Sequence, residues 1–345
     1  MIRRPALVRG RLERFVLDSR VLRGNALGDP HRREVHVYLP PEYDGDPKRR
    51  FPLFVDIVGF MGSGAAHLNW KPFDESVPLR LERLARARKM GPVIAVFPDC
   101  FTRLGGNQYI NSSAVGRYAD YLVREVVPEV ERRYRTFGDP GHRALFGKSS
   151  GGYGAIVHGM RYARHWGAIA CHSGDMYFDF CYGADIPRTL DSLAKQGGPA
   201  KFLRAFFSRR KLGTDEVHTI MFLAMAAFYD PDPDAPLGFR LPMDLRTGEI
   251  DRDRWARWLR HDPIRILERR NAQAQLRSLR GIYVDCGFRD QYFLHYGARI
   301  LHRRLGELGI PHRYEEFDDD HSSVDYRMDV SLPWLYRKLM RRARP

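Results

Sequence analysis

Short, nearly continuous apolar runs that alternate with amphipathic stretches constrain the fold of this chain more than any other feature. Such runs have the length and composition of strands that are buried on both faces of a sheet. The clearest are FPLFVDIV (51–58), PVIAVF (92–97) and GIYVDC (281–286), with helical periodicity at residues 78–89, 151–164 and 296–308. This alternation predicts an α/β fold with a mostly parallel central sheet and helices on both of its faces.

The ends of the pattern predict where the sheet begins and where an insertion interrupts it. Residues 33–43 (REVHVYLPPEY) alternate apolar and polar side chains and then stop at Pro40-Pro41, as an antiparallel edge strand would. Residues 118–134 have helical spacing that Pro128 interrupts. The strand-helix rhythm breaks after residue 175. We therefore expect a core domain of residues 1–175 and 277–345, and an inserted helical lid at residues 176–276.

Two motifs overlap in LFGKSSGGYG (145–154), and only one of them has its full context. A phosphate-binding loop needs a glycine five residues before Gly147, but that position is His142. A nucleophile elbow needs a strand, a sharp turn with small residues two before and two after the serine, and then a helix. Gly147 and Gly151 flank Ser149 in this way. The motif therefore predicts that Ser149 is a nucleophile.

A nucleophilic serine needs a histidine to take its proton and a carboxylate to orient that histidine. In this topology the chain order is serine, acid, histidine, with both partners in loops after later strands. Asp290 follows the strand at residues 281–286, and His321 follows the strand at residues 312–317. The sequence therefore predicts Ser149, Asp290 and His321 as a catalytic triad.

Each triad position has a competitor in the sequence. Asp285 is near Asp290, but it lies inside a strand, where a carboxylate more often makes a structural hydrogen bond. His172 follows the strand directly after the elbow helix, which is too early in the chain order, and His295 is expected to open a helix. We assign no role to residues 318–320 (DDD).

The oxyanion of a tetrahedral intermediate needs preorganised N–H donors. One is expected to be the backbone N–H of Ser150, which opens the helix after the nucleophile. The second is expected from the glycine-rich loop after residues 51–58, where we favour the N–H of Phe60 and keep that of Met61 as the alternative.

The net charge of +15 raises the question of a nucleic-acid ligand. Basic residues alternate with acids along most of the chain, and only the short tail at residues 337–344 is nearly free of acids. Of the 57 basic residues only eight are lysine, a skew that genome composition can produce without any function. A solvated charged surface is the usual explanation of such a pattern, so we expect no nucleic-acid partner.

Cofactor and compartment follow from the remaining composition. The four cysteines show no C-x-x-C spacing and the thirteen histidines no ligand spacing, so we expect free thiols, no metal and no cofactor. The longest apolar run, at residues 220–229, is too short to span a membrane. No apolar segment follows the charged residues 1–5, so the sequence predicts no secretory signal and a cytoplasmic protein. It leaves a homo-oligomer open.

Several segments resemble the putative esterase family of α/β hydrolases, which includes esterase D (S-formylglutathione hydrolase), feruloyl and acetylxylan esterases, siderophore esterases and mycolyltransferases. The segments are REVHVYLPPEY (33–43), FPLFVDIVG (51–59), IAVFPD (94–99), YLVREVVPEVERRYRT (121–136), GKSSGG (147–152), ACHSGD (170–175), VDCGFRD (284–290) and DHS (320–322). The resemblance implies an α/β-hydrolase fold and the same triad of Ser149, Asp290 and His321. This chain departs from many relatives at Val58, where they carry a histidine, and in the size of its insertion.

Together these patterns predict a serine carboxylic-ester hydrolase that forms an acyl-enzyme with a small or medium ester substrate. The aromatic residues of the insertion suit an apolar or aromatic part of that substrate, or only the insertion's own core. Acyl transfer and thioester hydrolysis use the same acyl-enzyme and remain alternatives. A non-catalytic binding protein on a hydrolase scaffold is the alternative from another class, because fold does not fix function.

Overall fold

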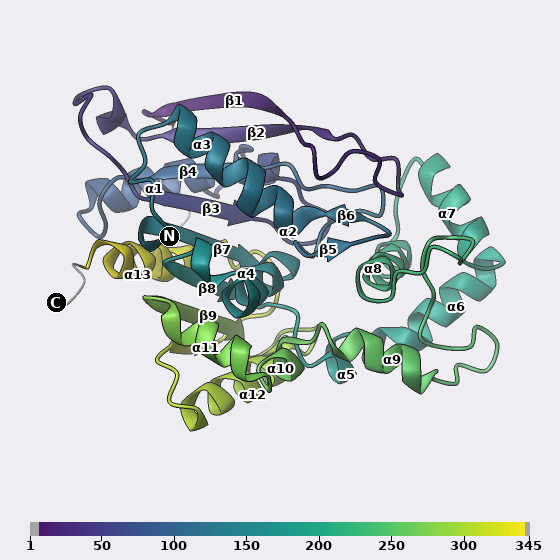
Figure 1. Cartoon of the computed structure of the whole chain (residues 1–345). Coiled ribbons are helices and arrows are strands. Elements are labelled where there is room, and N and C mark those ends of the chain that lie inside the picture. Colours follow the sequence, from purple (N-terminus) through teal and green to yellow (C-terminus); the bar gives the residue numbers. More distant parts are fainter. Residues whose placement is uncertain (1–6, 342–345) are drawn as a thin grey trace.

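One mixed sheet of eight strands forms the centre of the computed structural model, which describes residues 7–341 (Figure 1). The strands are β1 (Arg11–Asp18), β2 (Arg32–Leu39), β3 (Leu53–Ile57), β4 (Ile94–Pro98), β7 (Arg143–Lys148), β8 (Ala168–His172), β9 (Gly281–Gly287) and β10 (Arg313–Phe317). Their order across the sheet is β1-β2-β4-β3-β7-β8-β9-β10. The six strands from β4 to β10 run parallel, as the apolar runs predict, and β1 and β2 extend the sheet in antiparallel pairing.

Helices cover both faces of the sheet and form the insertion (Figure 1). Their bounds are α1 (Val77–Arg86), α2 (Tyr118–Asp120), α3 (Val127–Arg133), α4 (Ser150–Arg161), α5 (Phe178–Cys181), α6 (Ile186–Gln196), α7 (Pro199–Ser208), α8 (Thr214–Tyr229), α9 (Arg252–Leu259), α10 (Pro263–Ile266), α11 (Arg270–Ser278), α12 (Leu294–Glu307) and α13 (Met328–Met340). A two-stranded hairpin, β5 (Asn111–Ser112) with β6 (Gly116–Arg117), lies outside the main sheet.

Alternation along the buried strands divides the core into two apolar layers. In β3, Leu53, Val55 and Ile57 pack into the larger layer, which also takes up α4, α11 and α12. Phe54 points to the opposite face and packs into the smaller layer, under α1 and α13. Because both layers are apolar, each of these strands is buried on both sides, which explains its nearly continuous run of hydrophobic residues.

The edge of the sheet differs from the sequence prediction. The segment expected at the edge forms β2, but it pairs with β4 on one side and with β1 on the other, so β1 is the edge strand. Most of β1 is exposed or half-buried, and only Phe15 is buried. An edge strand is held by backbone pairing along one side and needs few buried residues, so it leaves a weak apolar signal in the sequence.

Pro128 shapes the helical stretch at residues 118–134. The chain follows α2, then a π-helical segment at Tyr121–Val126, and then α3, in which Pro128 lies in the first turn. A proline has no N–H and its ring crowds the carbonyl four residues earlier. The wider π-helical turns before Pro128 leave room for that ring, so the predicted interruption is a change of helix type rather than a break.

Residues 176–276 add no strand to the sheet and contain α5 to α10 and most of α11. Helices α6 to α9 lie at one end of the molecule, while α10 and α11 return to pack near α4 (Figure 1). Aromatic rings form the centre of the insertion, with Tyr229 in contact with Phe178, Tyr182 and Trp258. All four rings are buried. Phe178 and Tyr229 also contact Tyr153 of α4, so these rings form one continuous core with the larger apolar layer.

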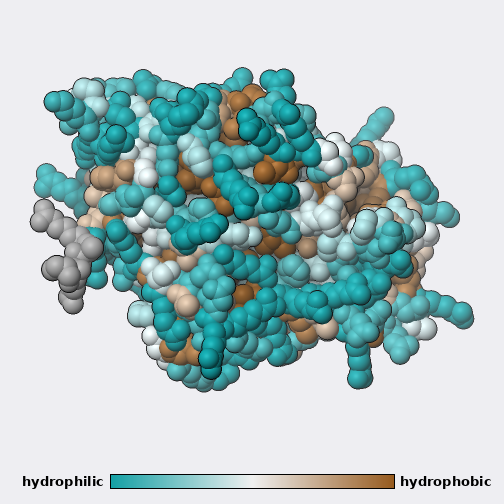
Figure 2. Space-filling model, in the orientation of Figure 1, coloured by the Kyte–Doolittle hydropathy of each residue, from teal (hydrophilic) through white to brown (hydrophobic). Residues whose placement is uncertain are grey.

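The surface and the thiols agree with the composition. Hydrophilic residues dominate the face seen in Figure 2, with apolar atoms showing only in scattered patches. All four cysteines are buried free thiols. Within residues 7–341, no helix combines the length and the apolar character that a bilayer span requires. The interpretation of residues 1–5 lies outside the described residues, as do residues 342–344 of the basic tail.

Candidate active site

Ser149 occupies a strained turn between β7 and α4. Its φ of 57° and ψ of −124° lie in a region that side chains other than glycine rarely adopt. Two backbone hydrogen bonds hold it there: its N–H donates to the carbonyl of His172 at 2.9 Å, and its carbonyl accepts from the N–H of Tyr153 at 2.8 Å. The turn therefore has the backbone strain expected of a nucleophile elbow.

The two glycines of the motif are required by close packing against β3. A Cβ atom added at Gly147 or at Gly151 would overlap the carbonyl oxygen of Ile57. Both positions have ordinary backbone angles, so the need for glycine comes from space and not from conformation. The same packing holds the elbow at the carboxyl edge of the sheet, beside the loop that follows β3.

Asp290 and His321 meet because their strands are neighbours. β9 and β10 run parallel, so the loops that follow them leave the sheet at the same edge. His321 Nδ1 lies 2.8 Å from Asp290 Oδ2, and the N–H of Tyr292 donates to the other carboxylate oxygen at 2.9 Å. A carboxylate only accepts hydrogen bonds, so it fixes the proton on Nδ1 and leaves Nε2 of a neutral imidazole as an acceptor.

Ser149 lies at the same edge of the sheet, in the turn after β7. β7, β8, β9 and β10 are consecutive in the sheet, and their carboxyl ends carry Ser149, Asp290 and His321. The hydroxyl of Ser149 makes no hydrogen bond within residues 7–341. Contacts of this kind often tighten only when a substrate binds. The strand order therefore brings Ser149, Asp290 and His321 to one edge of the sheet.

A second histidine-aspartate pair lies inside the protein. His172 Nδ1 is 2.6 Å from Asp285 Oδ1, and its Nε2 is 2.9 Å from the hydroxyl of Ser331. All three side chains are buried, and Arg327 also donates to Asp285 at 2.9 Å. Because this network connects β8, β9 and α13 and is closed to solvent, its contribution is to the packing of the sheet.

Two backbone N–H groups beside Ser149 have no acceptor among residues 7–341. The N–H of Ser150 belongs to the first residue of α4 and has no intrahelical partner. The N–H of Phe60 makes no hydrogen bond within the described chain, whereas that of Met61 donates to the carbonyl of Gly105 at 2.8 Å. A Cβ added at Gly59 would lie 3.3 Å from that of Ser149, so this loop touches the nucleophile. Of the two alternatives for the second oxyanion donor, only Phe60 has its N–H free.

Sequence reasoning missed a buried polar network beside the nucleophile. Gln108 Nε2 donates to the hydroxyl of Ser150 at 2.7 Å, and both groups contact Asp175 Oδ2, at 3.3 and 3.4 Å. The hydroxyl of Tyr182 donates to the same oxygen at 2.8 Å. Asp175 ends the ACHSGD segment after β8, so its place at the carboxyl edge was the available signal.

The insertion reaches the candidate site through two stacked rings. The ring of Tyr292 meets that of His321 edge to face, with centroids 4.8 Å apart, and stacks on the ring of His218 from α8 at 5.6 Å. His218 Nδ1 in turn lies 3.2 Å from a carboxylate oxygen of Asp185, which precedes α6. Residues of the insertion therefore form part of the wall beside His321.

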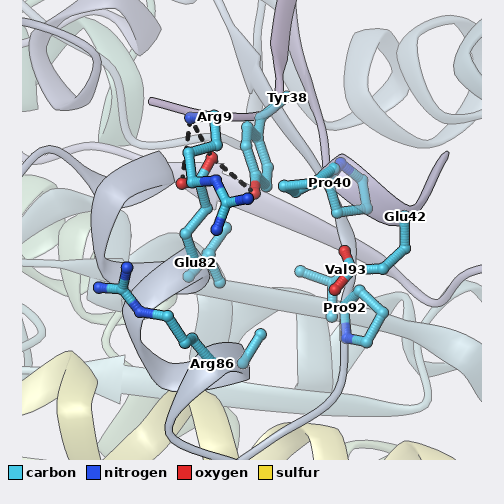
Figure 3. A pocket seen from close by; sticks show the side chains of 11 residues that line it. Arg9, Tyr38, Pro40, Glu42, Glu82, Arg86, Pro92 and Val93 are labelled. Carbon is cyan, nitrogen blue, oxygen red and sulfur yellow. Dashed lines mark hydrogen bonds between the residues drawn. The ribbon is translucent and has the colours of Figure 1, made fainter. Parts of the chain in front are cut away.

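Several cavities lie away from these residues. One of about 310 Å³ lies between β2 and α1, where Glu82 accepts hydrogen bonds from the backbone N–H groups of Arg9 and Gly10 (Figure 3). Its lining includes Pro92 and Val93, just before the amino end of β4, so it lies at the edge of the sheet opposite Ser149. Another of about 540 Å³ borders residues 61–63 of the loop after β3.

A mostly parallel sheet flanked by helices, with a serine on the turn after a central strand and a histidine-aspartate pair after the last strands, defines a protein of the α/β-hydrolase type. Comparison with known families gives a more specific result. The model of the family described as "Putative esterase" matches residues 25–331, and this chain belongs to that family.

One curated relative is Esterase Rv1288 of Mycobacterium tuberculosis (strain ATCC 25618 / H37Rv). It is 30% identical to this chain over 146 residues. The match covers 41% of this chain and 28% of the relative, so the chain corresponds to little more than a quarter of that protein.

Solved structures share the fold over almost the whole chain. A ferulic acid esterase superposes with a TM-score of 0.62 at 19% identity and covers 95% of this chain and 98% of its own. An S-formylglutathione hydrolase from Agrobacterium tumefaciens superposes with a TM-score of 0.58 at 15% identity and covers 98% and 99%. At these identities the similarity concerns the fold.

Proposed function

We propose that this chain is a serine carboxylic-ester hydrolase. Ser149 Oγ attacks the ester carbonyl while His321 Nε2 takes its proton, and Asp290 holds the imidazole through Nδ1. The N–H groups of Ser150 and Phe60 donate hydrogen bonds to the oxyanion that forms from the carbonyl oxygen. His321 then gives its proton to the leaving alcohol, and a water molecule, activated by the same imidazole, releases the acid from the acyl-enzyme.

The observation that carries this proposal is the joint placement of a strained serine and a histidine-aspartate pair at one edge of the sheet. The φ of 57° at Ser149 and the distance of 2.8 Å between His321 and Asp290 are independent features of distant segments. Backbone strain persists only where the surrounding structure enforces it, and it concentrates at functional sites. Membership of the esterase family supports the same chemistry.

The loop that carries Asp290 offers an apolar surface for the substrate. Phe288 and Phe293 are both 42% exposed, whereas the central rings of the insertion, such as those of Tyr229 and Trp258, are buried. Exposed rings beside a reaction centre favour contact with an apolar or aromatic group. We propose that a small or medium ester places such a group against these two rings, and that residues 176–276 act as the lid of the site.

Hydrolysis of p-nitrophenyl esters, from acetate to decanoate, tests the proposal. The Ser149→Ala variant should lose at least about a thousandfold in kcat on every ester that the wild type turns over. An organic fluorophosphonate should add to the wild-type protein at Ser149, as read by peptide mass spectrometry, and should leave Ser149→Ala unmodified. The chain-length optimum would measure the acyl pocket.

Ser278→Ala is the matched control. Ser278 ends α11 just before the amino end of β9, far from the carboxyl edge, and its exposed hydroxyl only donates to the carbonyl of Gln275. It should leave kcat unchanged. Activity that survives Ser149→Ala, or no turnover of any ester together with no adduct, would contradict the proposed function.

A further inference from the structure

Asp175 carries a carboxylate whose two oxygens have different surroundings. Oδ2 accepts from the hydroxyl of Tyr182 at 2.8 Å, from Gln108 Nε2 at 3.3 Å and from the hydroxyl of Ser150 at 3.4 Å. Three donors on one oxygen fix the orientation of the whole carboxylate. Since Tyr182 is itself held within the aromatic core of the insertion, that orientation is rigid.

The second oxygen, Oδ1, is the free one. It accepts no hydrogen bond from residues 7–341. The residue is only 6% exposed, but this oxygen is not fully buried and solvent reaches it. No lysine or arginine of the described chain pairs with Asp175. A nearly buried carboxylate oxygen with no partner has an unmet demand for a hydrogen-bond donor.

Two relationships place Asp175 beside the reacting groups. It contacts the side chain of Ser150, whose N–H is the proposed oxyanion donor. Burial raises the pKa of Asp175, while the hydrogen bond from Tyr182 and the imidazole of His321 act against that rise. Asp175 therefore lies beside the start of α4, at the same carboxyl edge of the sheet as Ser149 and His321.

Tyr292, whose ring contacts that of His321, has several carboxylates nearby. Burial and three nearby carboxylates raise the pKa of the Tyr292 phenol, and Arg188 opposes them. The carboxylates are those of Asp185, Asp290 and Asp175. Although the chain has a net charge of +15, a local concentration of carboxylates favours the binding of hydrogen-bond donors and cations over that of anions.

We infer that Asp175 is a specificity-determining residue whose Oδ1 binds a hydroxyl or ammonium group of the substrate, near the scissile ester bond. The preferred substrate is therefore an ester with a hydrogen-bond donor on its acyl or alcohol part, and not a purely hydrocarbon ester. This inference rests on the proposed hydrolase function, because it deepens the description of the same site.

Two series of phenyl and alkyl esters test the inference with the full chain. The acyl series compares phenyl butyrate with phenyl 2-hydroxybutyrate, 3-hydroxybutyrate and 3-aminobutyrate, and the alcohol series compares propyl, 2-hydroxyethyl and 2-aminoethyl butyrate. In at least one series, kcat/KM should favour a donor-bearing ester by about 10- to 100-fold, as a hydrogen bond to a charged group implies. Equal kcat/KM within both series would overturn the inference.

The Asp175→Asn variant replaces the accepting oxygen Oδ1 with a donating NH₂ group and keeps the side chain's other hydrogen bonds. The amide oxygen can accept from Tyr182, Gln108 and Ser150, and the amide NH₂ then takes the place of Oδ1. A hydroxyl can accept from this NH₂, but an ammonium cannot. The variant should therefore lose the preference for the ammonium ester and keep part of that for the hydroxyl ester.

Asp185→Asn is the matched control, because it removes one carboxylate from the same wall without touching Asp175. It should change the ammonium preference far less than Asp175→Asn does. An equal loss of the ammonium preference in both variants would show that the combined negative charge of the carboxylates selects the substrate, and not the contact with Asp175. That result would overturn the assignment.

Binding to the Ser149→Ala protein separates this inference from the proposed function. The Kd of each ester, measured by calorimetry, requires no catalysis and should show the same preference for the donor. A preference in binding without any hydrolysis by the wild type would refute the hydrolase and retain the subsite. Hydrolysis that depends on Ser149 without a donor preference would refute the subsite and retain the hydrolase.

Discussion

His321 Nδ1 lies 2.8 Å from Asp290 Oδ2, and a neighbouring backbone N–H holds the other oxygen of that carboxylate. The two residues are separated by a strand, and only the parallel pairing of β9 with β10 brings their loops together. Because Asp290 is buried, its carboxylate is fixed against the imidazole and not shared with solvent. This contact determines which nitrogen of His321 faces the nucleophile.

Asp290→Asn should therefore lower kcat by about 10⁴-fold, because an amide at this position can stabilise the wrong tautomer of His321. The melting temperature should change little, since Asn keeps the shape of the side chain. Ester hydrolysis and thermal unfolding of the same preparation would measure both effects. Activity of Asp290→Asn close to that of the wild type would remove Asp290 from the triad.

Asp285→Asn should have the opposite profile. It takes a buried partner from His172 and from Arg327, so the free energy of unfolding should fall by about 3 kcal/mol. The folded fraction should keep most of its kcat, because Ser149 and His321 do not contact Asp285. Urea unfolding followed by circular dichroism, together with kcat per folded molecule, would check this. A large loss of kcat without a loss of stability would contradict it.

Gly151→Ala should prevent the elbow from packing. The added methyl group would overlap the carbonyl oxygen of Ile57, and neither backbone can move without displacing β3 or α4. We expect a fall in stability of several kcal/mol, or no folded protein. Gly306→Ala is the control, because a Cβ there meets nothing within 4 Å inside α12, and alanine should be neutral or stabilise by up to about 1 kcal/mol. Equal melting temperatures for the two variants would refute the packing argument.

Stability should fall as the pH is lowered from 6.5 towards 4, partly because of His158. Burial lowers the pKa of His158 to about 4, and the neutral ring accepts from Trp166 Nε1 and donates to the carbonyl of Tyr109. The unfolded chain binds this proton near pH 6.5 and the folded chain does not, so up to about 3 kcal/mol of stability present above pH 6.5 is lost by pH 4.

His158→Gln tests this pH dependence, because glutamine offers the same donor and acceptor without titrating. Urea unfolding at pH 7.5, 6 and 5 should show a shallower decline for the variant than for the wild type. Burial also lowers the pKa of His261, to about 3, so that residue contributes in the same direction and the decline should not vanish. Identical slopes for the two proteins would exclude the contribution of His158.

The strands that the sequence predicts best are those buried on both faces. β3 and β9 carry nearly continuous apolar runs because both of their sides lie in apolar layers, and such runs can be recognised without any tertiary information. β1 was missed because only Phe15 among its residues is buried. The sequence signal of a strand follows its burial and not its hydrogen bonding.

For the candidate site, the sequence by itself determined the elbow, because a strand, two glycines around Ser149 and a helix are adjacent in the chain and depend on local geometry. It also determined the chain order of Asp290 and His321. Only the tertiary structure decided that the N–H of Met61 is occupied by Gly105, and that Asp175 is held with one oxygen free. Those contacts join segments far apart in the sequence, and no local propensity encodes the partner across such a distance.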